Sequence, residues 1–214
     1  MVYLISDIHG DKNFDGLRKY LSIATDDDLL IVLGDVELSF YNNDQNSEFT
    51  KEFLNIDKNI AFIDGNHDNH PYVNSFPIEE WNGGKIHRLT KNVVHLIRGN
   101  VYTIESKKIF VMGGCKSSQK WYDSGLVYDG EVPTESEISC AVDNLARNNN
   151  SVDYILTHKY WDYSDCNYSD FTLEWLTNYI DKNVKFKKWY SGHWHCEKNF
   201  DDKHFVIYDA LTKI

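Results

Sequence analysis

Short, unbroken apolar runs recur along the chain and are rich in β-branched and aliphatic residues. Three lie at residues 2–5, 29–33 and 60–63, and a fourth lies at residues 154–156. Apolar runs of this length, uninterrupted by polar residues, are typical of strands that are covered on both faces. We therefore expect four buried strands.

Apolar residues at helical spacing separate the first three of these runs. Within residues 14–24 they recur three and four positions apart, and Asn13 precedes them as a candidate helix cap. A weaker pattern of the same kind, formed by Phe49, Phe53 and Leu54, lies between the second and third runs. Strands that alternate with helices in this way predict a parallel β-α-β-α-β arrangement.

The rest of the chain has a different pattern. Short β-like runs at residues 85–89, 93–97, 101–105 and 107–112 are separated by turn residues, which predicts antiparallel hairpins. Thr134 and Glu137 then have the spacing of a capping box, which predicts a helix that ends near Arg147.

A further helix, at residues 171–180, and strands near 189–191 and 204–207 are expected in the last part. The whole pattern predicts a single α/β domain over residues 1–214, with either one mixed sheet or two packed sheets flanked by helices.

Composition mainly excludes functions. The chain has 22 basic and 33 acidic residues and a formal charge of −11. An acidic surface repels phosphate backbones, which argues against extended nucleic-acid binding, whereas bound divalent cations would still permit a small anionic substrate. No apolar run approaches the ~20 residues of a membrane helix, and the start lacks a signal-peptide pattern, so we expect a cytoplasmic protein.

The cysteines favour a simple interpretation. Cys115, Cys140, Cys166 and Cys196 form no Cys-x-x-Cys pair, which favours free thiols in a reducing compartment. Cys196 directly follows His195, but a metal site built from cysteine and histidine would need a second nearby cysteine.

Residues that can bind metal ions are concentrated directly after the expected strands. They are Asp7, His9, Asp35, Asn66, His158, His193 and His195. In α/β sheets, ligands bind outside the carboxyl ends of the strands. We therefore expect these side chains to meet at one edge of the fold.

The donor types indicate the chemistry of this edge. Carboxylate, imidazole and amide oxygen donors suit first-row ions, of which we favour manganese, with iron, zinc or nickel as alternatives. Seven donors exceed the needs of one ion, whereas two ions that share a carboxylate account for them. Taken singly, Asp7 could cap a helix, Asp35 could lie in a turn, and His193 and His195 would point to opposite faces of a strand. Their joint order favours a metal site.

The motif order Asp-x-His, Gly-Asp, Gly-Asn-His-Asp, His and Gly-His-x-His resembles that of the calcineurin-like metallophosphoesterases. The resemblance implies an α/β sandwich of two packed mixed β-sheets flanked by helices. It also implies that Asp7, His9 and His195 hold one ion, that Asn66, His158 and His193 hold the other, and that Asp35 bridges them. His67 would be the acid that faces the leaving group.

Two stretches depart from that family pattern. Leu38 replaces the second Asp of Gly-Asp-x-x-Asp, which often orients the catalytic histidine, so Glu37 and Asp68 become the candidates to orient His67. Asp64 and Asp68 flank the third motif where the protein-phosphatase branch has an arginine and a glutamate. The phosphate-binding arginines of that branch are absent.

These features predict an enzyme, a dinuclear-metal-dependent phosphoester hydrolase that uses a metal-bridging hydroxide as nucleophile. We favour a phosphodiesterase that acts on a small anionic substrate such as a nucleotide, with His67 as the proton donor to the leaving alkoxide. The alternatives are a phosphomonoesterase or protein phosphatase, a nuclease acting on short single-stranded ends, and a scaffold that has lost catalysis.

Segment 113–132 is long for a connection in a compact domain, and such loops are often functional. It carries Lys116 and Lys120, and we expect it to border the metal site, with one of these lysines contacting the substrate. A solvated surface loop is the alternative. Trp194, between two predicted ligands, is a candidate to stack on a ring of the substrate or is a packing residue. The histidines outside the motifs, His87, His95 and His204, are expected to lie at the surface or to be partly buried.

Overall fold

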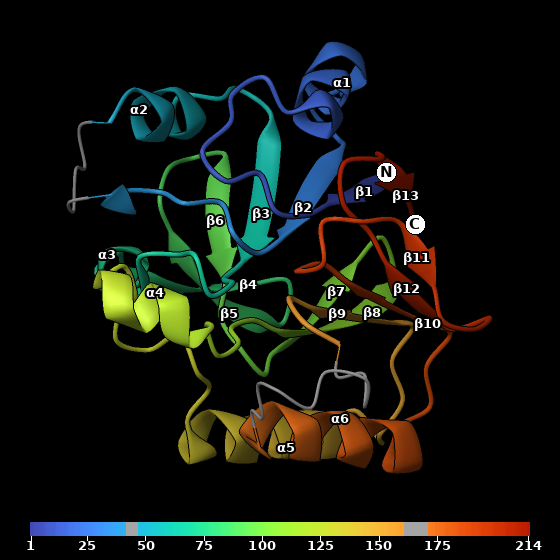
Figure 1. The fold of residues 1–214 in the computed structure, drawn as a ribbon. Helices are drawn as coiled ribbons and strands as arrows, with labels where there is room; N and C mark the ends of the chain where they lie inside the picture. Colours follow the sequence, from blue (N-terminus) through green and yellow to red (C-terminus); the bar gives the residue numbers. More distant parts are fainter. Residues whose placement is uncertain (42–46, 161–170) are drawn as a thin grey trace.

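Two mixed β-sheets pack face to face between layers of helices in the computed structural model, which describes residues 1–41, 47–160 and 171–214 (Figure 1). The helices are α1 (Asp15–Ile23), α2 (Glu48–Leu54), α3 (His70–Asn74), α4 (Gln119–Ser124), α5 (Glu135–Arg147) and α6 (Phe171–Asn183). This arrangement confirms the α/β sandwich with two packed sheets.

The first sheet has seven described strands in the order β13-β1-β2-β3-β6-β5-β4. They are β1 (Val2–Ile5), β2 (Leu29–Leu33), β3 (Asn59–Ile63), β4 (Ile78–Trp81), β5 (Gly84–Arg88), β6 (Val93–Leu96) and β13 (Thr212–Lys213). Strands β1, β2, β3 and β6 are parallel to one another, which confirms the expected parallel start of the chain.

The second sheet has six described strands in the order β11-β12-β10-β9-β8-β7. They are β7 (Val101–Ile104), β8 (Lys107–Met112), β9 (Tyr154–Thr157), β10 (Lys188–Ser191), β11 (Lys198–Asn199) and β12 (His204–Val206). Strands β8, β9, β10 and β12 are parallel. The carboxyl ends of β8, β9 and β10 are therefore at one edge of this sheet.

The expectation of an antiparallel middle section was only partly correct. Strands β5 and β6 form an antiparallel pair in one sheet, and β7 and β8 form another in the second sheet. However, β6 also pairs in parallel with β3, and β8 pairs in parallel with β9. The chain changes sheets between β6 and β7, and hairpin patterns alone do not indicate such a crossover.

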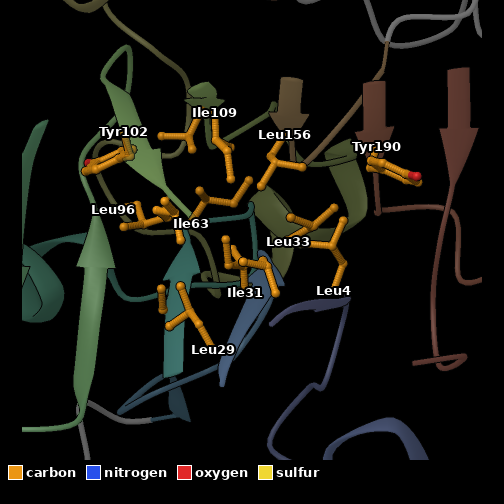
Figure 2. Packing of buried hydrophobic residues seen from close by; sticks show 14 of the residues in the cluster. Leu4, Leu29, Ile31, Leu33, Ile63, Leu96, Tyr102, Ile109, Leu156 and Tyr190 are labelled. Atoms are coloured by element: carbon orange, nitrogen blue, oxygen red, sulfur yellow. The ribbon is translucent and has the colours of Figure 1, made fainter. Parts of the chain in front are cut away.

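Alternation along the buried strands explains how the layers pack. In β2, Leu29, Ile31 and Leu33 face the second sheet, and Leu30 and Val32 pack against the helices on the outer face. Figure 2 shows the core between the sheets, where side chains from β1, β2 and β3 meet side chains from β8, β9 and β10. Because both faces of these strands are covered, the sequence has no polar alternation there. Full burial of each large aliphatic side chain contributes about 1.5–3 kcal/mol.

Helices cover the two outer faces of the sandwich. Helices α1 and α2 cover the first sheet, and α5 and α6 cover the second (Figure 1). Thr134 and Glu137 form the expected capping box at the start of α5. None of the helices in the described ranges is long and apolar enough to cross a membrane.

The start of α1 differs from the expectation that Asn13 caps it. The N-cap residue is Phe14, which makes no side-chain cap, and the Asn13 amide donates to the Asp11 carboxylate at 2.8 Å. The Asp209 carboxylate, almost two hundred residues away in sequence, accepts from the Gly16 amide at 2.7 Å and satisfies a free N–H of the first turn. The cap is a tertiary contact and has no local sequence signal.

A buried ionic cluster supports the loop after β3. The Asp64 carboxylate accepts hydrogen bonds from the Arg98 guanidinium and lies 3.0 Å from His95 Nε2. Arg98 also donates to the carbonyl groups of Gly130 and Glu131, which ties segment 113–132 to this loop. The expectation for the histidines outside the motifs was wrong, because His87, His95 and His204 are all at least nine-tenths buried.

Candidate metal centre

The predicted ligands all follow carboxyl ends of parallel strands, which brings them together at one edge of the two sheets. Asp7 and His9 follow β1, Asp35 follows β2, and Asn66 follows β3. His158 follows β9, and His193 and His195 follow β10 in the other sheet. The site is therefore built where both sheets present these ends.

The first group of donors is formed by Asp7, His9, Asp35 and His195, whose ligand atoms lie within 4.8 Å of one another. His9 Nε2 faces His195 Nε2 at 2.9 Å, and His195 Nε2 lies 3.3 Å from Asp7 Oδ1. These separations suit donors that share one ion. The three ligands that the family resemblance assigns to one ion, Asp7, His9 and His195, therefore lie together.

The second group of donors surrounds His158, which is fully buried. His158 Nε2 lies 3.1 Å from Asn66 Oδ1 and 3.3 Å from His193 Nδ1. The other ring nitrogen, His158 Nδ1, donates to the Leu33 carbonyl at 2.7 Å. That hydrogen bond places the proton on Nδ1 and leaves the lone pair of Nε2 facing the other donors of this group. Metal-binding histidines usually have such a hydrogen-bond acceptor at their second ring nitrogen.

Cys115 is a member of this second group that the sequence reasoning missed. Its Sγ, with donor atoms of His158 and His193, forms a set within 4.8 Å. Cys115 is fully buried, whereas Cys140 and Cys196 are exposed. Cys166 lies outside the described residues.

Asp35 lies between the two groups and presents one carboxylate oxygen to each. Oδ2 lies 3.6 Å from His9 Nε2, and Oδ1 lies 3.4 Å from His158 Nε2. Oδ1 also accepts from the His67 amide at 2.7 Å, which fixes the carboxylate. This position is compatible with a carboxylate that two ions share.

The electrostatics of the site suit a cation. Burial, followed by the charges of Asp7 and Asp68, raises the pKa of Asp35 well above its ordinary value. Asp7 Oδ1 is buried and lacks a hydrogen-bond partner among the described residues. Since buried carboxylates need a partner, a divalent ion at this position would satisfy the orphan oxygen and the crowded negative charge. The residues present therefore fit a metal centre.

Five of the seven predicted ligands have a backbone conformation that is unfavourable for residues other than glycine. Asp7, His9, Asp35, His193 and His195 all have positive φ, from 48° to 72°. Non-glycine residues rarely adopt this conformation, and such residues cluster at functional sites. At the end of β10 the strained backbone turns His193 toward His158 and His195 toward His9. This resolves the objection that alternate strand residues point to opposite faces.

Two glycines permit the close approach of these loops. A Cβ at Gly34, which has φ +92°, would collide with the His158 ring, and a Cβ at Gly65 would collide with Asp35. Gly34 therefore lets the loop after β2 pack against His158 of the other sheet, and Gly65 lets the loop after β3 pack against Asp35.

His67 lies beside the metal ligands, at the wall of the site. Its ring packs edge-on against the Trp121 ring, with centroids 4.3 Å apart, and its Nδ1 lies 3.7 Å from Glu37 Oε1. Burial, followed by the charges of His9 and His158, lowers the pKa of His67 to about 4. The imidazole is therefore neutral at neutral pH and can offer an N–H as a hydrogen-bond donor.

The two candidates to orient His67 have different surroundings. The Asp68 carboxylate accepts four backbone hydrogen bonds, from Gly65, Asp35, Val36 and Glu37, at 2.7–3.0 Å. Asp68 thus holds the two ligand loops together. Glu37 instead approaches the His67 ring and also contacts His9 Nδ1 at 2.8 Å, which makes Glu37 the nearer candidate.

A cavity of about 540 Å³ opens over the donor groups. It is lined by His9, Asp35, Glu37, Tyr41, Asn66, His67, Lys116, Ser118, Trp121, Lys159, His193, Trp194 and His195. Segment 113–132 therefore borders the site, through Lys116, Ser118 and Trp121. Lys120 is exposed on α4 and is not a lining residue.

The chain is similar to known proteins at the level of its family. A family model described as calcineurin-like phosphoesterase matches residues 1–197, a range that contains all seven predicted ligands. No curated protein sequence matches the chain. A crystal structure of a protein of unknown function from Aquifex aeolicus is similar at 15% identity and a TM-score of 0.44, with 87% of each chain covered. On the strength of the family match, which spans most of its length, the chain belongs to the calcineurin-like phosphoesterases.

Proposed function

We propose that the chain is a phosphodiesterase that uses two divalent metal ions to hydrolyse small anionic substrates. The observation that carries this proposal is Asp35, whose two carboxylate oxygens face the two donor groups. Two ions at such a site make water nucleophilic near neutral pH and neutralise charge on the phosphate. Asp7, His9 and His195 would hold one ion, and Asn66, His158 and His193 the other.

The residues of the chain have distinct roles in this reaction. His67, at the wall of the cavity, has a neutral ring at neutral pH, so it would donate a hydrogen bond to the leaving oxygen and transfer a proton only from its protonated form. Glu37 is the nearer of the two carboxylates that could orient His67, and its Oε1 would need to move closer than the present 3.7 Å to accept a hydrogen bond from Nδ1. Trp121 packs edge-on against that ring and limits its movement. The leaving group would therefore lie near Trp121.

The charge of the cavity favours a diester over a monoester. Its described lining includes Lys116 and Lys159 but no arginine. A phosphomonoester carries up to two negative charges near neutral pH, as a phosphorylated side chain does, whereas a diester carries one. The described lining has no arginine to bind the additional charged oxygen of a monoester. The monoester therefore gains less binding free energy here than in a site that contains an arginine.

A hydrolysis screen tests the substrate class. We expect kcat/KM for bis-p-nitrophenyl phosphate to exceed that for p-nitrophenyl phosphate when the enzyme is loaded with Mn²⁺. Cyclic nucleotides, dinucleoside polyphosphates and short single-stranded DNA complete the comparison. Turnover of phosphoserine peptides with none of the diesters would reverse the assignment in favour of a protein phosphatase.

Lys116 and Lys120 provide a matched pair for a test of substrate binding. Both are exposed lysines of the same segment, but only Lys116 lines the cavity. Lys116→Ala should raise KM for an anionic diester several-fold, because an ammonium group near the phosphate is lost. Lys120→Ala should leave KM unchanged, and both variants should keep their metal. Equal effects of the two changes would show that Lys116 does not contact the substrate.

A further inference from the structure

Cys115 lies against the second donor group in a position that its sequence context does not suggest. Its Sγ is 3.0 Å from Asn66 Oδ1 and 3.6 Å from His193 Nδ1. The side chain is fully buried and follows the carboxyl end of β8, as the predicted ligands follow their strands. The Gly114 amide donates to the Asp64 carbonyl at 2.7 Å, which fixes this segment beside the loop that carries Asn66.

Four donor atoms of different chemistry therefore converge on one point. The His158 and His193 nitrogens are 3.3 Å apart, and His158 Nε2 is 3.1 Å from Asn66 Oδ1. In a tetrahedral zinc site, bond lengths of about 2.0–2.1 Å to nitrogen and about 2.3 Å to sulfur imply nitrogen–nitrogen separations of about 3.3 Å and sulfur–nitrogen separations of about 3.6 Å. The two separations that involve His193 agree with these values, whereas Asn66 Oδ1 is only 3.0 Å from Cys115 Sγ, the distance of a hydrogen bond.

We propose that the Cys115 thiolate is a ligand of the ion held by Asn66, His158 and His193. The proposal rests on the metal-dependent function proposed above and extends it to a sulfur ligand. The Cys115 thiol donates to Asn66 Oδ1 in this structure. On metal binding, the thiol proton leaves to solvent, the sulfur gains a bond to the ion, and the Asn66 oxygen becomes free to coordinate as well.

A thiolate changes which ion the second site selects. Sulfur is a soft donor that favours Zn²⁺ over Mn²⁺, whereas carboxylate and amide oxygens favour the harder ions. The first donor group, with no cysteine among its described members, lacks this preference. The two sites would therefore differ, with a softer ion beside Cys115 and a harder ion beside Asp7.

Spectroscopy of the Co²⁺-loaded protein tests this ligand without reference to activity. A thiolate bound to Co²⁺ gives an intense charge-transfer band in the near ultraviolet, and imidazole, amide and carboxylate donors do not. The wild type should show this band and bind two equivalents of Co²⁺. Cys115→Ser should lose the band but still bind Co²⁺, and Cys115→Ala should do the same. Cys140→Ser, which changes an exposed cysteine on α5, is the matched control and should keep the band.

Competition between metals provides a second measurement. Cys115→Ser should lower the affinity for Zn²⁺ relative to that for Mn²⁺ at one site. The loss of a residue that only hydrogen-bonds to a metal ligand lowers affinity by ~10–100-fold, and the loss of the ligand itself should lower it by at least as much. If the wild type binds two Co²⁺ without the band, or Cys115→Ser retains it, Cys115 is not a ligand and the proposed function is unaffected. If no Co²⁺ binds to any variant, both proposals are wrong.

Discussion

Replacing Asp35 with Asn should weaken the binding of both metal ions and abolish hydrolysis. Asp35 presents one oxygen to each donor group. Its carboxylate is buried, so water screens its charge little. The amide keeps the shape but removes the negative charge and one acceptor oxygen. Metal affinity should fall by more than the ~10–100-fold that accompanies loss of an outer partner. Metal content by elemental analysis and kcat/KM for a diester measure the two effects.

His9→Ala provides the contrast for Asp35→Asn. His9 belongs to the first donor group, so its loss should affect chiefly one ion and leave about one equivalent bound. Circular dichroism would verify that both variants are folded. If Asp35→Asn kept two ions, or lost only the one that His9→Ala loses, Asp35 would not be the bridge.

His67→Ala should keep both ions and lose most turnover. The ring lies at the wall of the cavity and is not a member of either group that holds an ion in our proposal. Removal of a general acid typically costs ~10²–10⁴-fold in rate. The loss should be large for substrates with alkoxide leaving groups and small for p-nitrophenolate, which leaves without a proton. The measurement is kcat for a series of diesters with graded leaving groups, together with metal content.

An equal loss of rate for every leaving group would remove His67 from the role of proton donor. A loss of metal in His67→Ala would instead make it a ligand, in agreement with its place in a cluster with His9 and Glu37. The two outcomes are distinguishable because one changes the rate alone and the other changes stoichiometry.

The core strands, and the edge at which the predicted ligands meet, were predictable because both depend on local patterns. An unbroken apolar run such as residues 29–33 indicates a strand covered on both faces, and a polar residue directly after it lies at the carboxyl end. Asp7, Asp35 and His158 follow such runs, and the structure brings them together. Parallel strands share that edge, so chain order alone was sufficient.

Cys115 was not predicted by the same reasoning, because its strand was assigned to an antiparallel hairpin and its second, parallel neighbour was not expected. Strand β8 does pair with β7 in that way, but its other neighbour is β9, which is parallel to it. That second pairing puts the residues after β8 at the edge where His158 lies. A search for chemistry after every expected strand, including those in hairpins, would have found Cys115.

Contacts between distant segments explain the other differences. Asp68 appeared to belong to the chemistry of its motif, yet it binds the backbone of the loop after β2. Asp209 caps α1 from the far end of the chain. His95 is buried because Asp64 accepts its hydrogen bond. Each case depends on a tertiary partner, and no spacing in the sequence specifies that partner.

The most direct test of the two-metal account is a titration of metal-free protein with Mn²⁺. At each step, both the amount of bound metal and the rate of diester hydrolysis are measured. The donor groups at Asp7 and at His158 should each take one ion, with Asp35 shared between them. We predict that activity is absent at the start and reaches its plateau at two equivalents of bound metal per chain. Full activity in metal-free protein, or a plateau at one equivalent, would contradict the account.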